Sequence, residues 1–171
     1  MTLHVATGNR ICLVGRNGSG KSTLLKVLSK TIEADDGTLF IQPGVTLSYL
    51  AQDHNLPSDL TPLDYCTRQH IDHFIASKYL DLLDVPADRL MAHLSGGEKR
   101  RIALAHALAK EADILCLDEP TNHLDMQTIE WLEDYCMHFK GAILVISHDR
   151  SFLNKVSNRT FLIDRGNLFV Q

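Results

Sequence analysis

An eight-residue glycine-rich segment constrains the fold of this chain more than any other feature. It fits the pattern G-x-x-x-x-G-K-[ST] and reads Gly15-Arg16-Asn17-Gly18-Ser19-Gly20-Lys21-Ser22. An apolar run at residues 10–14 precedes it, and residues 21–30 follow with leucines at helical spacing. The segment is therefore predicted to be a turn between a buried strand and a helix, which is the context that this phosphate-binding pattern requires.

Two properties of such a turn favour the binding of phosphate groups. Its successive backbone N–H groups point at phosphate oxygens, and the N-terminus of the following helix adds roughly half a positive charge. Lys21 would supply a mobile cation for the β and γ phosphates, and the Ser22 hydroxyl is an oxygen ligand suited to Mg²⁺. Larger side chains are expected to obstruct the phosphates at Gly15, Gly18 and Gly20. The alternative is an ordinary glycine-rich helix cap, which eight matching positions in this context disfavour.

A second apolar run, at residues 114–117, ends in two acids. Ligands of a doubly wound sheet lie at the carboxyl ends of its strands, so Asp118 and Glu119 are expected to face the phosphates. Asp118 would hold Mg²⁺ directly or through a water, and Glu119 would orient and polarise an attacking water. Taken alone, such an ending is a solvated strand end about half the time. Its combination with the glycine-rich turn favours the binding role.

The order of apolar runs and helical patterns indicates an α/β fold with a mostly parallel sheet flanked by helices. The 171 residues fit a single domain, 1–171. A hairpin turning at Pro43-Gly44 is predicted for residues 38–50 as a small antiparallel flank. A short helical insert is predicted at about 53–110. Further helices are expected at residues 126–139 and 150–156, and further strands at residues 142–146, 160–163 and 168–170.

Composition and charge exclude several classes of protein. Seventeen Lys plus Arg against twenty-one Asp plus Glu give a net charge of -4, so charge alone does not support nucleic-acid binding. The run Lys99-Arg100-Arg101 is predicted to be a solvated face rather than an RNA contact. The apolar runs are too short to span a membrane, and residues 1–9 contain no secretory signal, so a cytoplasmic location is expected. The four cysteines form no C-x-x-C pair and are predicted to be reduced and buried.

One further segment resembles a family motif. Leu94-Ser95-Gly96-Gly97-Glu98 is similar to the L-S-G-G-x signature of the ATP-binding cassette (ABC) ATPases, which have the P-loop NTPase fold. The other family motifs occur in the family's order, so the resemblance covers nearly the whole chain. They are Gln52 after a strand, the string at residues 117–125, and Ser147-His148-Asp149-Arg150 after another strand. The resemblance implies that the chain binds ATP with Mg²⁺ and hydrolyses the ATP.

The resemblance also assigns roles to single residues. Gln52 resembles the Q-loop residue that reaches Mg²⁺ and the attacking water. His148 resembles the switch histidine, whose neutral imidazole can donate to the γ phosphate. The catalytic residues are then Glu119, His148 and Gln52, and the metal ligands are Ser22, Gln52 and Asp118. The nucleotide-binding set extends from Gly15 to Thr23.

The signature segment implies a partner. Ser95, Gly96 and Gly97 are predicted to begin a helix, so their N–H groups and the helix dipole form a second anion site. In the family this segment, with Glu98, closes head to tail on the γ phosphate bound to an opposite ATPase unit. Asp125 resembles the D-loop residue that communicates across this nucleotide sandwich. The expected partner is a second ABC ATPase unit, either another copy or a missing tandem half.

The residues within these motifs indicate one branch of the family. The strings at residues 118–125 and 147–153 are similar to those of ABC-F proteins, and Ile163-Asp164-Arg165-Gly166 to that of Uup-type members. ABC-F proteins act on the ribosome, which is therefore an expected partner. Two alternatives remain open. The chain could be the ATPase subunit of a transporter, docking on transmembrane subunits without inserting into the membrane itself. It could also be a nucleotide-dependent interaction module with little hydrolysis.

The chain departs from the family pattern at its N-terminal end. Only nine residues precede the first predicted strand, whereas complete units begin with further strands and an aromatic residue that stacks on adenine. The resemblance implies that these strands and a second ATPase unit lie outside the chain, so weaker hold on adenine and reduced activity are expected.

Overall fold

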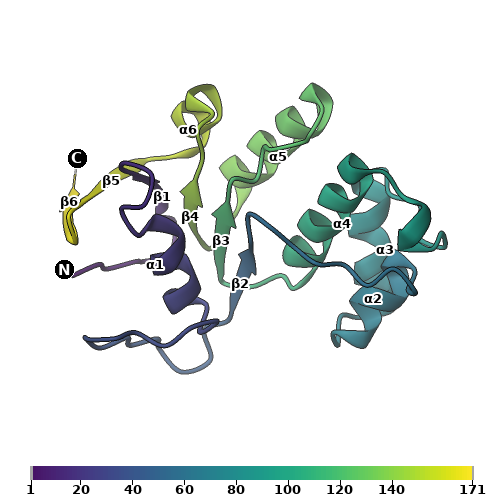
Figure 1. Ribbon diagram of the computed structural model, residues 1–171, viewed down its shortest axis with the longest axis horizontal. Helices are drawn as coiled ribbons and strands as arrows, with labels where there is room; N and C mark the ends of the chain where they lie inside the picture. Colours follow the sequence, from purple (N-terminus) through teal and green to yellow (C-terminus); the bar gives the residue numbers. More distant parts are fainter. Residues whose placement is uncertain (1, 171) are drawn as a thin grey trace.

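A six-stranded sheet forms the centre of the computed structural model, which describes residues 2–170 (Figure 1). The strand order is β2-β3-β4-β1-β5-β6, and every neighbouring pair is parallel except β5 with β6. The α/β fold with a mostly parallel sheet is therefore confirmed. The strands are β1 (Arg10–Val14), β2 (Leu47–Leu50), β3 (Ile114–Asp118), β4 (Ala142–Ile146), β5 (Arg159–Asp164) and β6 (Asn167–Val170).

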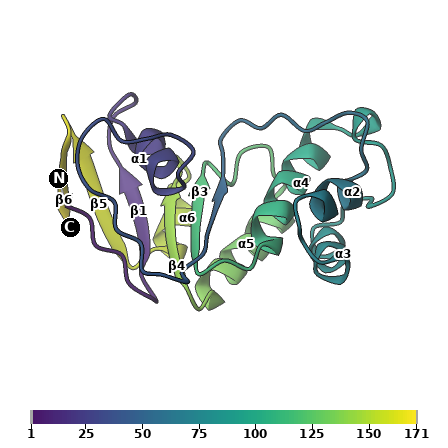
Figure 2. The same cartoon turned by 90° about the horizontal axis from the view of Figure 1, so that it is seen from below.

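Helices cover both faces of this sheet (Figure 2). One face carries α1 (Lys21–Leu28), and the other carries α5 (Met126–His138) and α6 (Arg150–Val156). Ile11 and Leu13 of β1 pack with Leu25 of α1 in one buried cluster. Cys12, between them, belongs with Leu132 of α5 to a second cluster. Because successive side chains of a strand point to opposite faces, one short apolar strand supports both layers.

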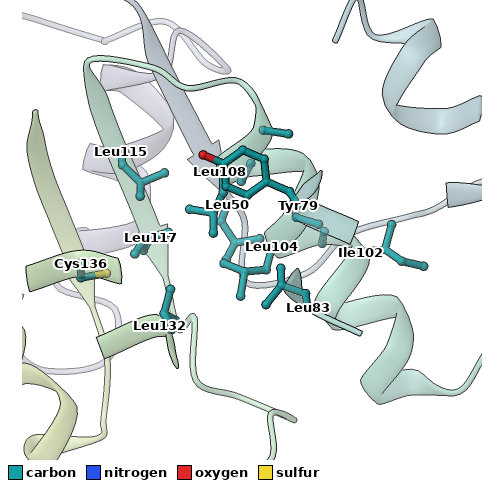
Figure 3. Close-up of a cluster of buried hydrophobic side chains, with 14 of the residues drawn as sticks. Leu50, Tyr79, Leu83, Ile102, Leu104, Leu108, Leu115, Leu117, Leu132 and Cys136 are labelled. Atoms are coloured by element: carbon teal, nitrogen blue, oxygen red, sulfur yellow. The ribbon is translucent and has the colours of Figure 1, made fainter. Parts of the chain in front are cut away.

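A helical part lies beyond β2, to the right in Figures 1 and 2. It contains α2 (Pro62–Arg68), α3 (His73–Leu82), the 3-10 turn η1 (Met91–His93) and α4 (Gly96–Ala109). Figure 3 shows the buried cluster that joins it to the sheet; its members include Leu50, Tyr79, Leu104, Leu108, Leu117 and Leu132. Among residues 2–170, no helix combines the length and the apolar character that crossing a membrane requires.

The hairpin predicted for residues 38–50 is wrong. Only Leu47–Leu50 forms a strand, and this strand pairs in parallel with β3, with Leu50 opposite Leu117. Residues 38–42 are irregular, and the Phe40 side chain is 81% exposed. Ser48 and Leu50 are buried because β2 pairs with β3 in the main sheet, whereas residues 38–42 are largely exposed and would gain little burial as a further strand. The antiparallel flank of the sheet is instead the pair of β5 and β6.

The cysteines are all buried and free, as the sequence predicts. Burial raises the pKa of the Cys66 thiol to about 11 and the pKa of Cys116 and of Cys136 to about 12. These thiols therefore stay protonated at neutral pH, and they are inert parts of the core.

Candidate functional site

The glycine-rich segment forms the loop between β1 and α1. Gly18 and Gly20 have φ angles of +77° and +96°, which L side chains rarely adopt, and no atom of the described part of the chain lies within 4 Å of a Cβ built at either position. A Cβ built at Gly15 would lie 2.4 Å from the carbonyl oxygen of Ile163 in β5. Backbone conformation therefore requires glycine at Gly18 and Gly20, and close packing on β5 requires it at Gly15.

Gly15→Ala is expected to lower the free energy of unfolding by about 1–3 kcal/mol, because the new methyl group displaces the loop or β5. The displaced loop should also bind ATP more weakly. Gly166→Ala, in the β5–β6 turn, is the matched control, since Gly166 has a φ of +78° and no atom of residues 2–170 lies within 4 Å of its built Cβ. Thermal melts of both variants measure the loss of stability, and ATP titrations measure the loss of affinity. An unchanged ATP affinity in Gly15→Ala would contradict the expected displacement of the loop.

Lys21 begins α1 and folds back over the loop. Its ammonium donates to the carbonyl oxygens of Gly15, at 2.8 Å, and of Arg16, at 2.9 Å. The charge of Lys21 is thereby held next to the N-terminus of α1, where the helix dipole is positive. This end of the loop therefore concentrates positive potential, which suits an anion with several charges.

A cavity of about 390 Å³ lies at the carboxyl ends of β1, β3 and β4. Because β4 lies between β1 and β3, the loop after β1 and the acids after β3 face each other across the end of β4. Lys21 and Asp118 line this same cavity. The residues that line it are Asn17, Gly18, Gly20, Lys21, Ser22, Thr23, Gln52, Asp118, Glu119, Ile146 and His148.

Asp118 is 1% exposed, and only one of its two carboxylate oxygens has a hydrogen-bond partner among the described residues. Its Oδ2 accepts a hydrogen bond from the Tyr49 hydroxyl at 3.4 Å, and burial, followed by the charge of Asp118, raises the pKa of Tyr49. Its Oδ1 is buried and has no hydrogen-bond partner within the described part of the chain. A buried carboxylate oxygen without a donor is costly, and a cation would offset this cost.

The donor set around Asp118 fits Mg²⁺. Residues 2–170 contain no group of three His, Cys, Asp or Glu side chains that could hold a metal ion by themselves. The cavity instead offers the Asp118 carboxylate with the hydroxyl of Ser22 and the amide of Gln52. Few protein oxygens, with phosphate oxygens and waters completing the shell, are the usual arrangement for Mg²⁺.

The Glu119 carboxylate contacts His148, whereas the Asp118 carboxylate contacts Tyr49. Its carboxylate accepts from the backbone N–H of His148 at 3.1 Å, and its Oε1 lies 3.3 Å from Nε2 of the same residue. Glu119 is 4% exposed and has a φ of +51°, a backbone conformation that is strained for glutamate. Such strain is concentrated at functional sites. The two neighbouring carboxylates therefore have different partners, Tyr49 for Asp118 and His148 for Glu119.

The signature residues lie apart from the cavity. Ser95 caps α4, where its hydroxyl accepts from the N–H of Glu98 at 3.2 Å and the Glu98 carboxylate accepts from the N–H of Ser95 at 2.7 Å. The hydrogen bond from the backbone N–H of Ser95 lowers the pKa of the Glu98 carboxyl group. Gly97 lies beside His123, because its built Cβ would be 3.6 Å from that carbonyl oxygen. At the start of α4, Ser95 and Gly96 are exposed and Gly97 and Glu98 are half-buried, and Asp125 is exposed as well.

The prediction that the run Lys99-Arg100-Arg101 is solvated is wrong for Arg100, which is 2% exposed. Its guanidinium binds backbone carbonyl groups instead of water. The signal in the sequence was its spacing, four residues before Leu104 and eight before Leu108 on the buried side of α4. Sequence reasoning also missed Tyr49, whose contact with Asp118 depends on the pairing of β2 with β3.

Comparisons with known proteins agree with this geometry. The family model described as "ABC transporter" matches residues 1–122. The "ATP-binding protein Uup" of Buchnera aphidicola is 40% identical over 98% of this chain, and that of Caulobacter vibrioides is 47% identical over 91%. The "Energy-dependent translational throttle protein EttA" of Mycobacterium tuberculosis is 32% identical over 99%. The chain spans only 30%, 26% and 38% of these three relatives.

Solved structures share the fold. A dimeric ATP-binding cassette in a post-hydrolysis state, bound to ADP and Pi, has a TM-score of 0.83 at 22% identity, and the match covers 98% of this chain and 88% of that chain. An archaeal ribosome recycling factor in complex with a ribosomal stalk protein has a TM-score of 0.77 at 28% identity, covering 92% of this chain and 32% of that chain. The second likeness is confined to about a third of the larger protein.

Proposed function

Because the chain belongs to the ABC transporter family, the ATP-binding cassette ATPases, and is similar to its Uup-type ABC-F members, we propose that its cavity binds ATP with Mg²⁺ and hydrolyses the ATP. One observation carries this proposal: Lys21, Asp118 and Glu119 line one cavity, although 96 residues of chain lie between Lys21 and Asp118. No role in the core explains why such groups converge.

The glycine-rich loop binds the phosphates. Backbone N–H groups between Gly15 and Thr23 donate to them, and the Lys21 ammonium exchanges its loop carbonyls for β and γ oxygens. Ser22, Gln52 and Asp118 hold the metal, with Oδ1 of Asp118 available as a ligand. Bound Mg²⁺ supplies positive charge that neutralises the phosphate oxygens.

Glu119 and His148 serve the hydrolytic step. Glu119 orients a water and accepts its proton as the water oxygen bonds to the γ phosphorus and the bond to ADP breaks. Glu119 is fixed by the backbone N–H of His148, while the His148 side chain is 74% exposed and free to turn. His148 can therefore leave Glu119 and donate to the γ phosphate.

The exposed start of α4 supports the second half of the proposal. Ser95, Gly96 and Gly97, with Glu98 and Asp125, close head to tail on the nucleotide of a second ATPase unit. That unit is a second copy of this chain or a second cassette, since the relatives are about three times as long as this chain. ATP binding then closes the pair, and hydrolysis opens it.

The ribosome is the partner that the comparisons favour. The name of one relative describes a translational throttle, and a solved relative is a ribosome recycling factor bound to a ribosomal stalk protein. We propose that sandwich closure acts on the ribosome, as in ABC-F proteins, rather than on a transporter subunit.

Two assays test the proposed function. Phosphate release from ATP should depend on Mg²⁺ and stop when the metal is chelated. ATP binding without phosphate release would instead indicate a nucleotide-dependent interaction module. In the second assay, Glu119→Gln should sediment with ribosomes when ATP is present, and Lys21→Ala, which cannot hold ATP, should not. Equal sedimentation of the two variants would contradict a nucleotide-dependent role on the ribosome.

A further inference from the structure

Arg100 is a charged side chain that the proposed function does not use. It lies on α4, is 2% exposed, and donates to four backbone carbonyl oxygens from one planar guanidinium. Its Nη1 reaches the oxygens of Ala51 at 2.9 Å and of Gln52 at 3.3 Å. Its Nη2 reaches the oxygens of Asp118 at 3.2 Å and of Glu119 at 2.8 Å.

These carbonyls belong to two segments that both line the cavity. Ala51 and Gln52 follow β2, and Asp118 and Glu119 end and follow β3. The two strands are parallel neighbours, and Leu50 opposite Leu117 is the last pair of their ladder. Just beyond that pair, the guanidinium takes the place of strand-to-strand hydrogen bonds and bridges the two backbones. Only arginine has donors arranged in a fork that can reach two such pairs at once.

Neutral groups surround the charge of Arg100. No carboxylate of the described residues lies within ion-pair distance of it, since the ion pairs found involve other side chains. Burial lowers the pKa of Arg100, while the more distant Asp118, Asp53 and Glu119 oppose this effect. Burial and the Arg100 charge also lower the pKa of His54, whose Nδ1 lies 3.4 Å from the guanidinium. Burying a cation costs free energy of folding, so a functional role beside the cavity would account for the placement of Arg100.

The hydrogen bonds of the Glu119 backbone indicate the role of Arg100. Glu119 has a φ of +51°, and its N–H donates to the carbonyl oxygen of Ile146 at 2.8 Å. On the other side of the same residue, the carbonyl oxygen accepts from Arg100 at 2.8 Å and, at the longer distance of 3.3 Å, from the backbone N–H of Asn122. Both peptide groups of Glu119 are thus fixed, which holds a strained conformation that glutamate would otherwise leave.

We propose that Arg100 is a positioning residue for ATP hydrolysis, which fixes Gln52 and Glu119 relative to each other by binding the backbones of both segments. The proposal rests on the proposed function. It also gives α4 a direct connection to the cavity, because Arg100 lies on the first turns of the helix that Ser95 caps. A movement of the signature segment against a second ATPase unit therefore moves the carbonyls of Gln52 and Glu119.

Steady-state kinetics and ATP titrations of Arg100→Gln and Arg100→Lys test the proposal. In Arg100→Gln, kcat should fall at least about tenfold, while KM and the Kd for ATP change less than about threefold, because the phosphate loop is intact. Arg100→Lys should recover part of kcat, since an ammonium can reach some of the carbonyls but not both pairs. An unchanged kcat, or a loss of ATP affinity equal to the loss of kcat, would overturn the proposal.

Arg10→Gln is the matched control, because Arg10 also donates to a backbone carbonyl, that of Val156 at 2.7 Å, but does not line the cavity. It should lower the melting temperature and leave kcat unchanged. If both Arg100 variants fail to fold while Arg10→Gln folds, the role of Arg100 is purely structural and the proposal is overturned.

Hydrogen exchange separates this proposal from the proposed function. If the unaltered chain releases no phosphate, the proposed function fails, but Arg100→Lys should still accelerate amide exchange at residues 51–54 and at Asp118 and Glu119 relative to Arg10→Gln. Equal exchange in both variants would overturn the positioning role.

Discussion

Lys21→Ala is expected to abolish tight ATP binding, with a rise in Kd of at least about 100-fold. Charge-assisted hydrogen bonds contribute about 1.5–3 kcal/mol each, and loss of two such bonds to phosphates corresponds to at least two factors of ten in affinity. The ammonium also donates to the carbonyls of Gly15 and Arg16, so its removal loosens the loop as well. Equilibrium titration with ATP and Mg²⁺ measures this effect.

Lys26→Ala is the control for this measurement, since Lys26 is an exposed lysine of the same helix and does not line the cavity. It removes the same charge and should leave the ATP affinity within about twofold, because exposed charges at a distance are screened. An unchanged affinity in Lys21→Ala would contradict the assignment of the phosphate site.

Glu119→Gln is expected to slow hydrolysis by about 10²- to 10⁴-fold, the usual contribution of a general base, and to leave ATP binding intact. The amide has nearly the shape of the carboxylate and can still accept from the N–H of His148, but it cannot take a proton from water. ATP should therefore accumulate in the closed state. Phosphate release measures the rate, and light scattering with ATP measures the mass, which should rise as two units pair.

Glu130→Gln is the control, because Glu130 is an exposed glutamate of α5 that does not line the cavity. Its rate and mass should match those of the unaltered chain. Equal phosphate release by Glu119→Gln and the unaltered chain would contradict the catalytic role of Glu119. An unchanged scattering mass would reject self-pairing and leave a separate cassette as the partner.

Strands and helices with strong local signals could be predicted from the sequence. The expected strands at residues 10–14 and 142–146 and the expected helix at residues 150–156 have the bounds of β1, β4 and α6. Each is a short apolar or amphipathic run between turn residues, so local propensity and packing agree. Residues 38–42 have the same local character, but a strand also needs a neighbouring strand to pair with. The local sequence pattern does not reveal that β2 pairs with β3 rather than with residues 38–42.

The residues of the site could be predicted from the sequence better than the hydrogen bonds and packing contacts between them. The motifs placed Lys21 at the start of the helix after β1 and Asp118 at the end of β3, and the position of β4 between these strands brings them to one cavity. The positive φ of Glu119, the partner of Asp118 Oδ2 and the burial of Arg100 all depend on how β2 and α4 pack beside β3. Such packing involves residues far apart in sequence, which local patterns do not reveal.

A crystal structure of Glu119→Gln with ATP and Mg²⁺ tests the phosphate site most directly. The triphosphate is expected against the N–H groups of the loop, with Lys21 on its β and γ oxygens and the metal bound by Ser22 and on the Oδ1 side of Asp118. Phosphates bound away from Lys21, or a metal that neither Ser22 nor Asp118 approaches, would contradict this site.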